Sequence, residues 1–161
     1  MTRLGVTATA ATDDAGEGLG TDPLDGYLVE EQVGFLLHRA HQRHAAVFLD
    51  GMAEADLTPT QFTALIKVVE LGRVTQNQLG RLVATDPATI QGVVRRLTAR
   101  GLIRRTTDPM DRRTAVLAAT QPGQALAAQA VALARRITAA TLDPLDPSER
   151  DQFLALLRKL A

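Results

Sequence analysis

The sequence contains no cysteine and no tryptophan, and aromatic residues make up only 3% of it. Without cysteine the chain can form no disulfide, no thiolate metal site and no thiol redox sensor. The scarcity of aromatic side chains argues against a binder of single-stranded nucleic acid, because such proteins stack bases on aromatic rings. No apolar run approaches the roughly 20 residues of a membrane-spanning helix. The first residues also lack the apolar core of a signal peptide, so we expect a cytoplasmic protein.

The charged residues are unevenly distributed, although the formal net charge of the 161-residue chain is zero. Residues 1–31 hold seven acidic residues and one arginine, and residues 1–22 show no periodicity. This pattern predicts a disordered acidic arm. The segment from Pro87 to Arg113 instead holds seven arginines and two aspartates. A local excess of positive charge is typical of a surface that binds double-stranded DNA.

Capping signals indicate where helices begin. An N-cap residue with Gln or Glu three positions later, the capping box, occurs at Thr58, Thr75 and Asp146, and the pairs Asp86-Pro87 and Thr120 with Pro122 give two further starts. The signals predict helices over 27–50, 59–71, 76–83, 87–100, 122–141 and 147–160, and strands near 102–106 and 114–119. This order predicts a mainly α fold with a small β-hairpin wing: a winged helix-turn-helix plus terminal helices that form a dimerisation domain.

The terminal helices require a partner. The segment 122–141 is rich in alanine and apolar around most of its circumference, which is typical of a buried helix. A small winged module offers little surface to bury it, so we expect residues 23–55 and 121–161 to form the dimerisation helices, with residues 56–120 as the DNA-binding domain. A two-fold homodimer also matches a palindromic operator. The alternative is a monomeric helical bundle.

The helix that begins at Pro87 is the expected recognition helix. Its apolar positions Ile90, Val93, Val94 and Leu97 have core spacing, and Arg100 lies towards the end of the opposite face. Gln91 can bond adenine and Arg95 can reach guanine or phosphate, although an amphipathic helix with solvated arginines would look the same in isolation. The candidate DNA contacts on this helix are Pro87, Ala88, Thr89, Gln91, Gly92, Arg95 and Arg96.

The hairpin that follows adds a second cationic element. Asp108-Pro109 predicts a turn, after which Arg113 or Arg112 projects from the tip. An arginine there suits the narrow minor groove of A·T-rich DNA, whose negative potential is enhanced. Arg104 and Arg105 are expected to contact phosphates or to brace the wing, and Asp111 can hold neighbouring arginines in position.

The string DPMDRRTAVLAATQPG resembles the wing signature of the MarR family of dimeric winged-helix regulators through Asp111, Arg113, Leu117, Thr120 and Gly123. The stretches LTPTQFTALIKVVE and TQNQLGRLVATDPATIQGVVRRLTARGLIRR are similar to the second helix and the helix-turn-helix of that family, and the resemblance covers about residues 28–160. Ala118-Ala119-Thr120 departs from the usual apolar-x-Leu-Thr ending. The resemblance implies that Asp111 orients the wing, that Arg113 enters the minor groove and that the terminal helices dimerise.

All three histidines, His38, His41 and His44, are spaced three residues apart on the first predicted helix. They can be metal ligands, structural groups in a helix seam, or ligands for an effector. The spacing spreads them over about 120° of the helix, which disfavours a metal site. MarR-like regulators commonly bind aromatic acids between the dimerisation helices and the DNA-binding lobe, and LLHRAHQRHAAVF is similar to regulators of aromatic-acid and nicotinate catabolism. The resemblance therefore implies an effector site, for which the candidate residues are His41, His44, Arg43, Thr60 and Thr63.

The sequence thus predicts a homodimeric, sequence-specific DNA-binding repressor that a small aromatic acid releases from a palindromic operator. We expect no catalysis, no cofactor and no metal. A ligand-independent or activating regulator and an architectural DNA-binding protein remain alternatives. A hydrolase lacks support because no nucleophile motif or glycine-rich phosphate loop is present, and a protein-interaction scaffold would leave the wing arginines unexplained.

Overall fold

The computed structural model describes residues 24, 26–107 and 115–160, and the chain divides into two units, Met1–Leu36 and Leu37–Ala161. The first unit contains a short 3-10 turn, η1 (Val29–Glu31), and the start of helix α1 (Val33–Gly51), most of which belongs to the second unit. The predicted 27–50 helix therefore starts late, at Val33. The reason is local: Gln32 takes an extended backbone conformation (φ −75°, ψ 139°), which no helix can continue through.

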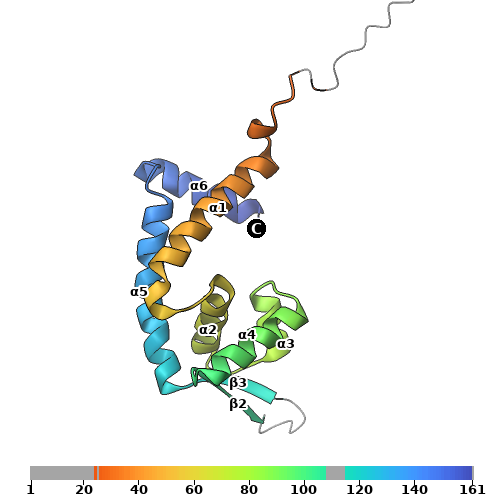
Figure 1. Ribbon diagram of the computed structural model, residues 1–161, viewed down its shortest axis with the longest axis vertical. Coiled ribbons are helices and arrows are strands. Elements are labelled where there is room, and N and C mark those ends of the chain that lie inside the picture. The colour runs from red at the N-terminus through yellow and green to blue at the C-terminus, as the bar shows by residue number, and fades with distance from the viewer. Residues whose placement is uncertain (1–23, 25, 108–114, 161) are drawn as a thin grey trace, which may run out of the picture. The chain divides into compact units, whose positions relative to one another are not determined.

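The second unit contains the predicted helix-turn-helix and hairpin (Figure 1). After the end of α1 its elements are η2 (Ala53–Ala55), α2 (Pro59–Leu71), β1 (Val74–Thr75), α3 (Gln76–Leu82), α4 (Pro87–Ala99), β2 (Ile103–Thr107), β3 (Ala115–Ala119), α5 (Gln121–Thr141) and α6 (Pro147–Leu160). The mainly α fold with a hairpin wing is confirmed. Strand β1 was not predicted; it pairs antiparallel with β3, which gives a three-stranded sheet in the order β1-β3-β2.

The predicted caps begin the helices of this unit. At α2 the Thr58 hydroxyl accepts the amide of Gln61 at 3.3 Å, and the Gln61 side chain accepts the amide of Thr58 at 3.2 Å. The same reciprocal pair joins Asp146 and Glu149 before α6. Side chains also accept helix amides before α3, α4 and α5, at Thr75, Asp86 and Thr120 respectively. Each cap satisfies amides that a helix end leaves without a partner.

One apolar cluster joins the end of α1 to helices α2 to α5. It contains Phe48 and Met52 near the end of α1, the inner residues of α2 to α4, and Leu133 and Ile137 of α5. The four core positions expected on α4 are all buried. Helices α1 and α5 cross closely, because a Cβ on Gly51 would lie 2.6 Å from Cγ1 of Ile137. Helices α2 to α4 thus pack on the two long helices through a continuous core.

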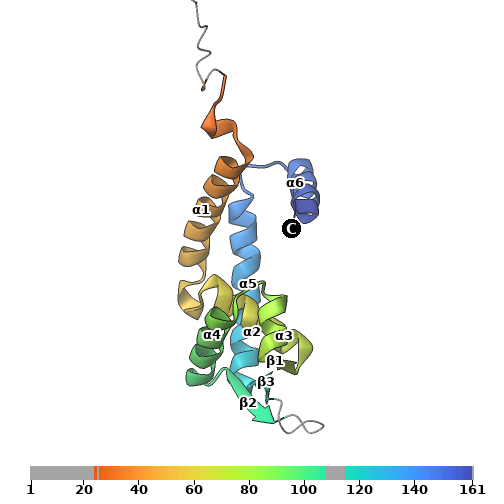
Figure 2. The ribbon, with the colours of Figure 1, turned by 90° about the vertical axis from the view of Figure 1, so that its right-hand side faces the viewer.

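Helix α5 buries only one side within this chain. Its buried residues are Gly123, Ala127, Ala130, Leu133 and Ile137, whereas the alanines 125, 128, 132 and 139 are exposed. Figure 2 shows α5 running between α1 and α6, with α6 attached through the turn that follows Leu142. Within the described ranges, no helix combines the length and apolar character that crossing a membrane would require.

Candidate DNA interface and effector pocket

The start of α4 is held by its N-cap residue. Asp86 accepts hydrogen bonds from the amides of Ala88 (3.0 Å) and Thr89 (2.9 Å). The Thr89 side chain also bonds this carboxylate, and that contact, followed by the Thr89 amide, lowers the pKa of Asp86. Because its hydroxyl is engaged with Asp86, Thr89 has its methyl group left for a contact with a thymine methyl. The first turn of α4 is therefore fixed in place by the protein itself.

The outward face of α4 carries the residues that the sequence predicts as DNA contacts. Pro87, Ala88, Thr89, Gln91, Arg95 and Arg96 are exposed, and Gly92 is half-buried. A Cβ on Gly92 would lie 3.6 Å from Nη1 of Arg96, so the Arg96 guanidinium lies over this glycine one turn away. The side chains on this face are therefore small near the helix start, which allows the backbone to approach base edges closely. Near the middle of the helix the face is cationic.

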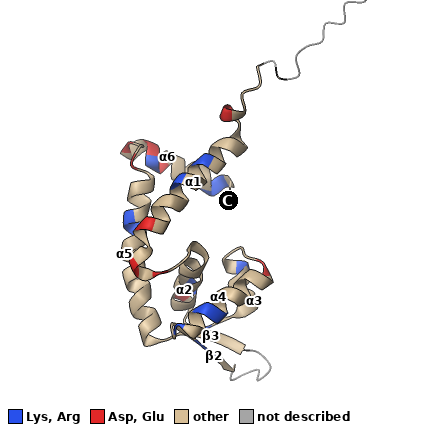
Figure 3. Cartoon of the chain, in the orientation of Figure 1, with Lys and Arg blue, Asp and Glu red and all other residues tan. Residues whose placement is uncertain are grey.

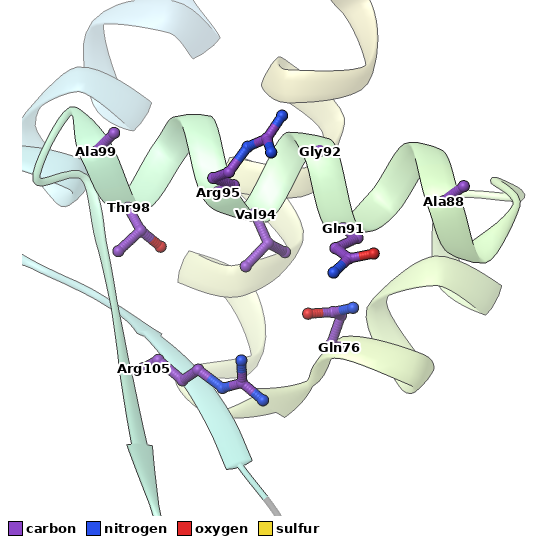
Figure 4. Close-up of a pocket in the computed structure, with 9 residues that line it drawn as sticks. All are labelled: Gln76, Ala88, Gln91, Gly92, Val94, Arg95, Thr98, Ala99 and Arg105. Carbon is purple, nitrogen blue, oxygen red and sulfur yellow. The ribbon is translucent and has the colours of Figure 1, made fainter.

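A hollow of about 620 Å³ lies between α4 and the sheet. In Figure 4 the side chains of Gln91 from α4 and Gln76 from the start of α3 point towards one another, and Arg105 extends from β2 towards the same space. Arg95 projects from another side of α4 in this view. The amides of Gln76 and Gln91 and the guanidinium of Arg105 thus line one concave surface, and Arg95 also borders it. Gln76 was not singled out from the sequence; its position directly after the Thr75 cap is the signal that marks it.

The two arginines of β2 have different positions. Arg104 pairs with Ala118 and Arg105 with Leu117 across the β2–β3 ladder, and neighbouring residues on a strand face opposite sides of the sheet. Only Arg105 lines the hollow under α4. Figure 3 shows basic residues on α3, α4 and β2. The predicted wing residues Asp111, Arg112 and Arg113 lie outside the described residues.

Arg100 does not extend the DNA-facing surface as the sequence suggested. Its guanidinium donates through Nη2 to the carbonyl of Ala55 at 3.1 Å and through Nη1 to the carbonyl of Asp56. Nη1 also lies 3.7 Å from the Asp56 carboxylate. The periodicity placed Arg100 on the polar face correctly, but its guanidinium is hydrogen-bonded to the connector between α1 and α2.

A second hollow, of about 360 Å³, lies between α1, the end of α5 and α6. His41 and His44 both line it, and Nδ1 of His44 lies 3.1 Å from the hydroxyl of Thr141. The ring of His44 also lies 6.1 Å from that of Phe48. The remaining lining is mostly apolar and consists of Leu37, Ala40, Thr138, Leu142, Phe153, Leu154 and Leu157. Its size and its few polar groups are typical of sites that bind small molecules.

The other predicted effector residues lie elsewhere. Arg43 donates through Nη2 to the carbonyl of Ala140 at 3.3 Å, on the α5 side of α1. The Thr63 hydroxyl donates to the carbonyl of Pro59 within α2, and neither Thr63 nor Thr60 lines the histidine hollow. His38 contacts Gln42 at 3.5 Å. Among the residues that the structure describes, no group of three His, Cys, Asp or Glu side chains is placed to hold a metal ion.

Comparisons with known proteins show which family this chain resembles. The model of the MarR family matches residues 57–115. The HTH-type transcriptional repressor NicR of Pseudomonas putida is 41% identical over 140 residues, which cover 86% of this chain and 89% of the relative. A probable transcriptional regulator from Pseudomonas aeruginosa superposes with a TM-score of 0.80 at 44% identity, covering 83% of this chain and all of that one. BpsR of Bordetella bronchiseptica, whose DNA binding is regulated by 6-hydroxynicotinic acid, superposes with a TM-score of 0.79 at 40% identity, covering 83% and 96%.

Proposed function

Because this chain belongs to the MarR family of DNA-binding transcriptional regulators, we propose that it is a homodimeric repressor released from a palindromic operator by a small aromatic acid. The observation that carries the DNA-binding part is the hollow beside α4, into which Gln76, Gln91 and Arg105 converge. An amide can bond adenine in two places, and a guanidinium can bond guanine or a phosphate. Each well-formed bidentate base contact discriminates by about 1–3 kcal/mol.

In this proposal α4 enters the major groove and the wing reaches the adjacent minor groove. Pro87, Ala88 and Thr89 approach the bases at the start of α4, while Arg95, Arg96 and Arg104 supply positive charge along the duplex. Arg113, with Arg112 beside it and Asp111 orienting the turn, enters the minor groove. The support for the wing contacts is the sequence resemblance together with the enhanced potential of narrow A·T-rich grooves.

The proposal of a homodimer rests on apolar surface that one copy leaves exposed. The outer alanines of α5 are exposed, and so are Phe153, Leu156, Leu157 and Leu160 of α6. In the first unit Tyr27, Leu28 and Val33 are exposed as well. Large exposed apolar surfaces commonly mark interfaces. Sedimentation at equilibrium should therefore give twice the chain mass of 17.2 kDa; the mass of a single chain under the same conditions would exclude this assembly.

The proposed effector site is the histidine hollow. Thr141 holds one nitrogen of His44, which leaves Nε2 for a ligand, and His41 lines the same space. An imidazole can bond a carboxylate or a phenolic hydroxyl, and the apolar lining suits an aromatic ring. Because BpsR responds to 6-hydroxynicotinic acid and NicR is a related repressor, we propose a hydroxynicotinate or hydroxybenzoate as the effector class. Arg43, Thr60 and Thr63, which the sequence also pointed to, do not line this hollow and are not part of the proposed site.

Footprinting on DNA upstream of the protein's own gene tests the DNA-binding proposal. We expect a protected palindrome, and we expect Arg113→Ala to weaken it while Arg135→Ala, an exposed change on α5, leaves it intact. Transcription from that promoter should fall when the protein is added. Uniform protection of any DNA would instead indicate an architectural protein, and a rise in transcription an activator.

Calorimetry tests the effector proposal. Wild-type protein titrated with 6-hydroxynicotinate should release or absorb measurable heat, and His44→Ala should abolish that signal. His38→Ala is the matched control, because His38 belongs to the same helix but does not line the hollow. Absence of heat with hydroxynicotinates and hydroxybenzoates alike, in a protein that still binds DNA, would remove this part of the proposal.

A further inference from the structure

The end of the recognition helix is attached to two other helices within three residues. Arg100 is the C-cap residue of α4, and its side chain is bound to the connector that follows α1. Gly101 and Leu102, which come next, are bound by the Thr120 hydroxyl at the start of α5 through their carbonyls, at 2.6 Å and 3.1 Å. In addition to the packing of its buried face, α4 is therefore attached at its C-terminal end to both the α1–α2 connector and the start of α5.

The connector that receives Arg100 is itself firmly held. Ala55 is only 1% exposed, and its neighbours Met52 and Leu57 are buried in the common core. Asp56 adopts a left-handed conformation (φ 48°, ψ 51°), which is unfavourable for a residue with a Cβ. Two consecutive carbonyls, those of Ala55 and Asp56, converge on one guanidinium. A planar fork with several donors is the group suited to such an acceptor pair.

From these contacts we infer that Arg100 is a positioning residue that clamps the recognition helix α4 to the connector that follows α1. The clamp has a consequence that rests on the proposed function. Helix α1 carries His44 about 10 Å before its last residue, and α5 spans about 30 Å between Thr120 and Thr141. Both helices therefore connect the histidine hollow at one end with the exit of α4 at the other. A change in their separation at the hollow reaches α4 through Arg100 and Thr120.

A distance measurement tests the clamp without any effector. The chain has no cysteine, so spin labels can be attached at Ala46→Cys on α1 and Ala99→Cys on α4, both exposed positions. With labelled protein diluted into unlabelled protein, Arg100→Ala should broaden the distance distribution, and Arg100→Lys should broaden it less. Asp56→Asn should leave it narrow, because it keeps both carbonyls. An unchanged distribution in Arg100→Ala would overturn the inference.

A coupling measurement separates this inference from the effector proposal. We expect 6-hydroxynicotinate to weaken operator binding by wild type about tenfold, within the usual range of allosteric coupling. In Arg100→Ala the ratio of the operator affinities measured without and with the acid should fall below about threefold. The affinity for 6-hydroxynicotinate itself should stay within about twofold of wild type. Arg135→Ala should behave as wild type. A tenfold ratio retained in Arg100→Ala would overturn the coupling role. A wild-type ratio of one would refute the effector proposal alone, and the spin-label result would still decide the clamp.

Discussion

Gly123 of α5 and Leu102, which precedes β2, approach so closely that a Cβ on residue 123 would lie 1.9 Å from the Leu102 carbonyl oxygen. The same junction contains the Thr120 hydroxyl, which accepts the amide of Gly123 at 3.1 Å and donates to Leu102. The first turn of α5 therefore packs directly on backbone at the exit of α4. Only glycine fits at this position, whatever helix propensity favours.

We predict that Gly123→Ala lowers the free energy of unfolding by about 3 kcal/mol, the upper range for overpacking, because backbone and not a flexible side chain meets the new methyl group. Urea denaturation measures this change. The matched control is Gly34→Ala, where a Cβ meets nothing within 4 Å and alanine favours the helix by up to about 1 kcal/mol. Equal stability of Gly123→Ala and wild type would contradict this prediction, because it would show that the Leu102 backbone moves to accommodate the methyl group at little cost.

A second prediction concerns Ala84, which has a positive φ of 50° in the turn between α3 and α4. A left-handed conformation costs a residue with a Cβ about 1–2 kcal/mol, whereas glycine adopts it freely at an entropic cost of about 0.5–1 kcal/mol. Ala84→Gly should therefore raise stability by about 0.5 kcal/mol. Ala128→Gly, on the exposed side of α5, should lower it by about 1 kcal/mol. The opposite signs are the expected result, and destabilisation by both changes would contradict it.

The pH dependence of stability should report the N-cap of α4. Its hydrogen bonds lower the pKa of Asp86 relative to the unfolded chain, so the ionised cap stabilises the fold above pH of about 4. This contribution is lost as the pH falls through the lowered pKa. The thermal midpoint of Asp86→Ala should lie below that of wild type at neutral pH, and the gap should shrink in acid. Asp86→Asn keeps a cap oxygen that does not titrate. A gap that stays constant from neutral pH to about pH 2.5 would exclude this role.

We expect substitutions of the amide and of the arginines at the proposed DNA interface to change DNA binding in different ways. Gln91→Ala should cost about 1–3 kcal/mol of binding and relax preference at one base pair. Arg105→Ala should weaken binding to all sequences and reduce the slope of log affinity against log salt by about one. Arg104→Ala is the matched comparison and should have the smaller effect, because Arg104 contributes charge but faces the other side of the sheet and does not line the hollow. Salt titrations of an operator fragment measure all three, and equal effects of Arg104→Ala and Arg105→Ala would contradict the geometry.

The sequence predicts helix starts well wherever a cap acts locally. Thr58, Asp86 and Asp146 each bond amides within three residues, so their effect is readable without the fold. The start of α1 was missed because no such cap precedes Val33. Strand β1 was missed because two residues show no period, and their strand conformation depends on the distant partner β3.

The functional surfaces follow the same division between local and distant contacts. The outward face of α4 follows from 3.6-residue periodicity and was predicted residue by residue. The hydrogen bonds from Arg100 to the connector join residues 44 or more positions apart, and no local sequence pattern reveals them. In the same way, pairing of His44 with Thr141 and closure of the hollow by α6 depend on long-range packing, whereas the sequence pointed to the start of α2.

The most direct test of effector-controlled DNA binding is the affinity of the protein for its upstream operator, measured by fluorescence anisotropy with and without saturating 6-hydroxynicotinate. We expect tight, sequence-specific binding that weakens about tenfold with the acid, and no weakening in His44→Ala. Sequence-specific binding that neither hydroxynicotinates nor hydroxybenzoates alter would contradict the claim that the histidine hollow controls the operator.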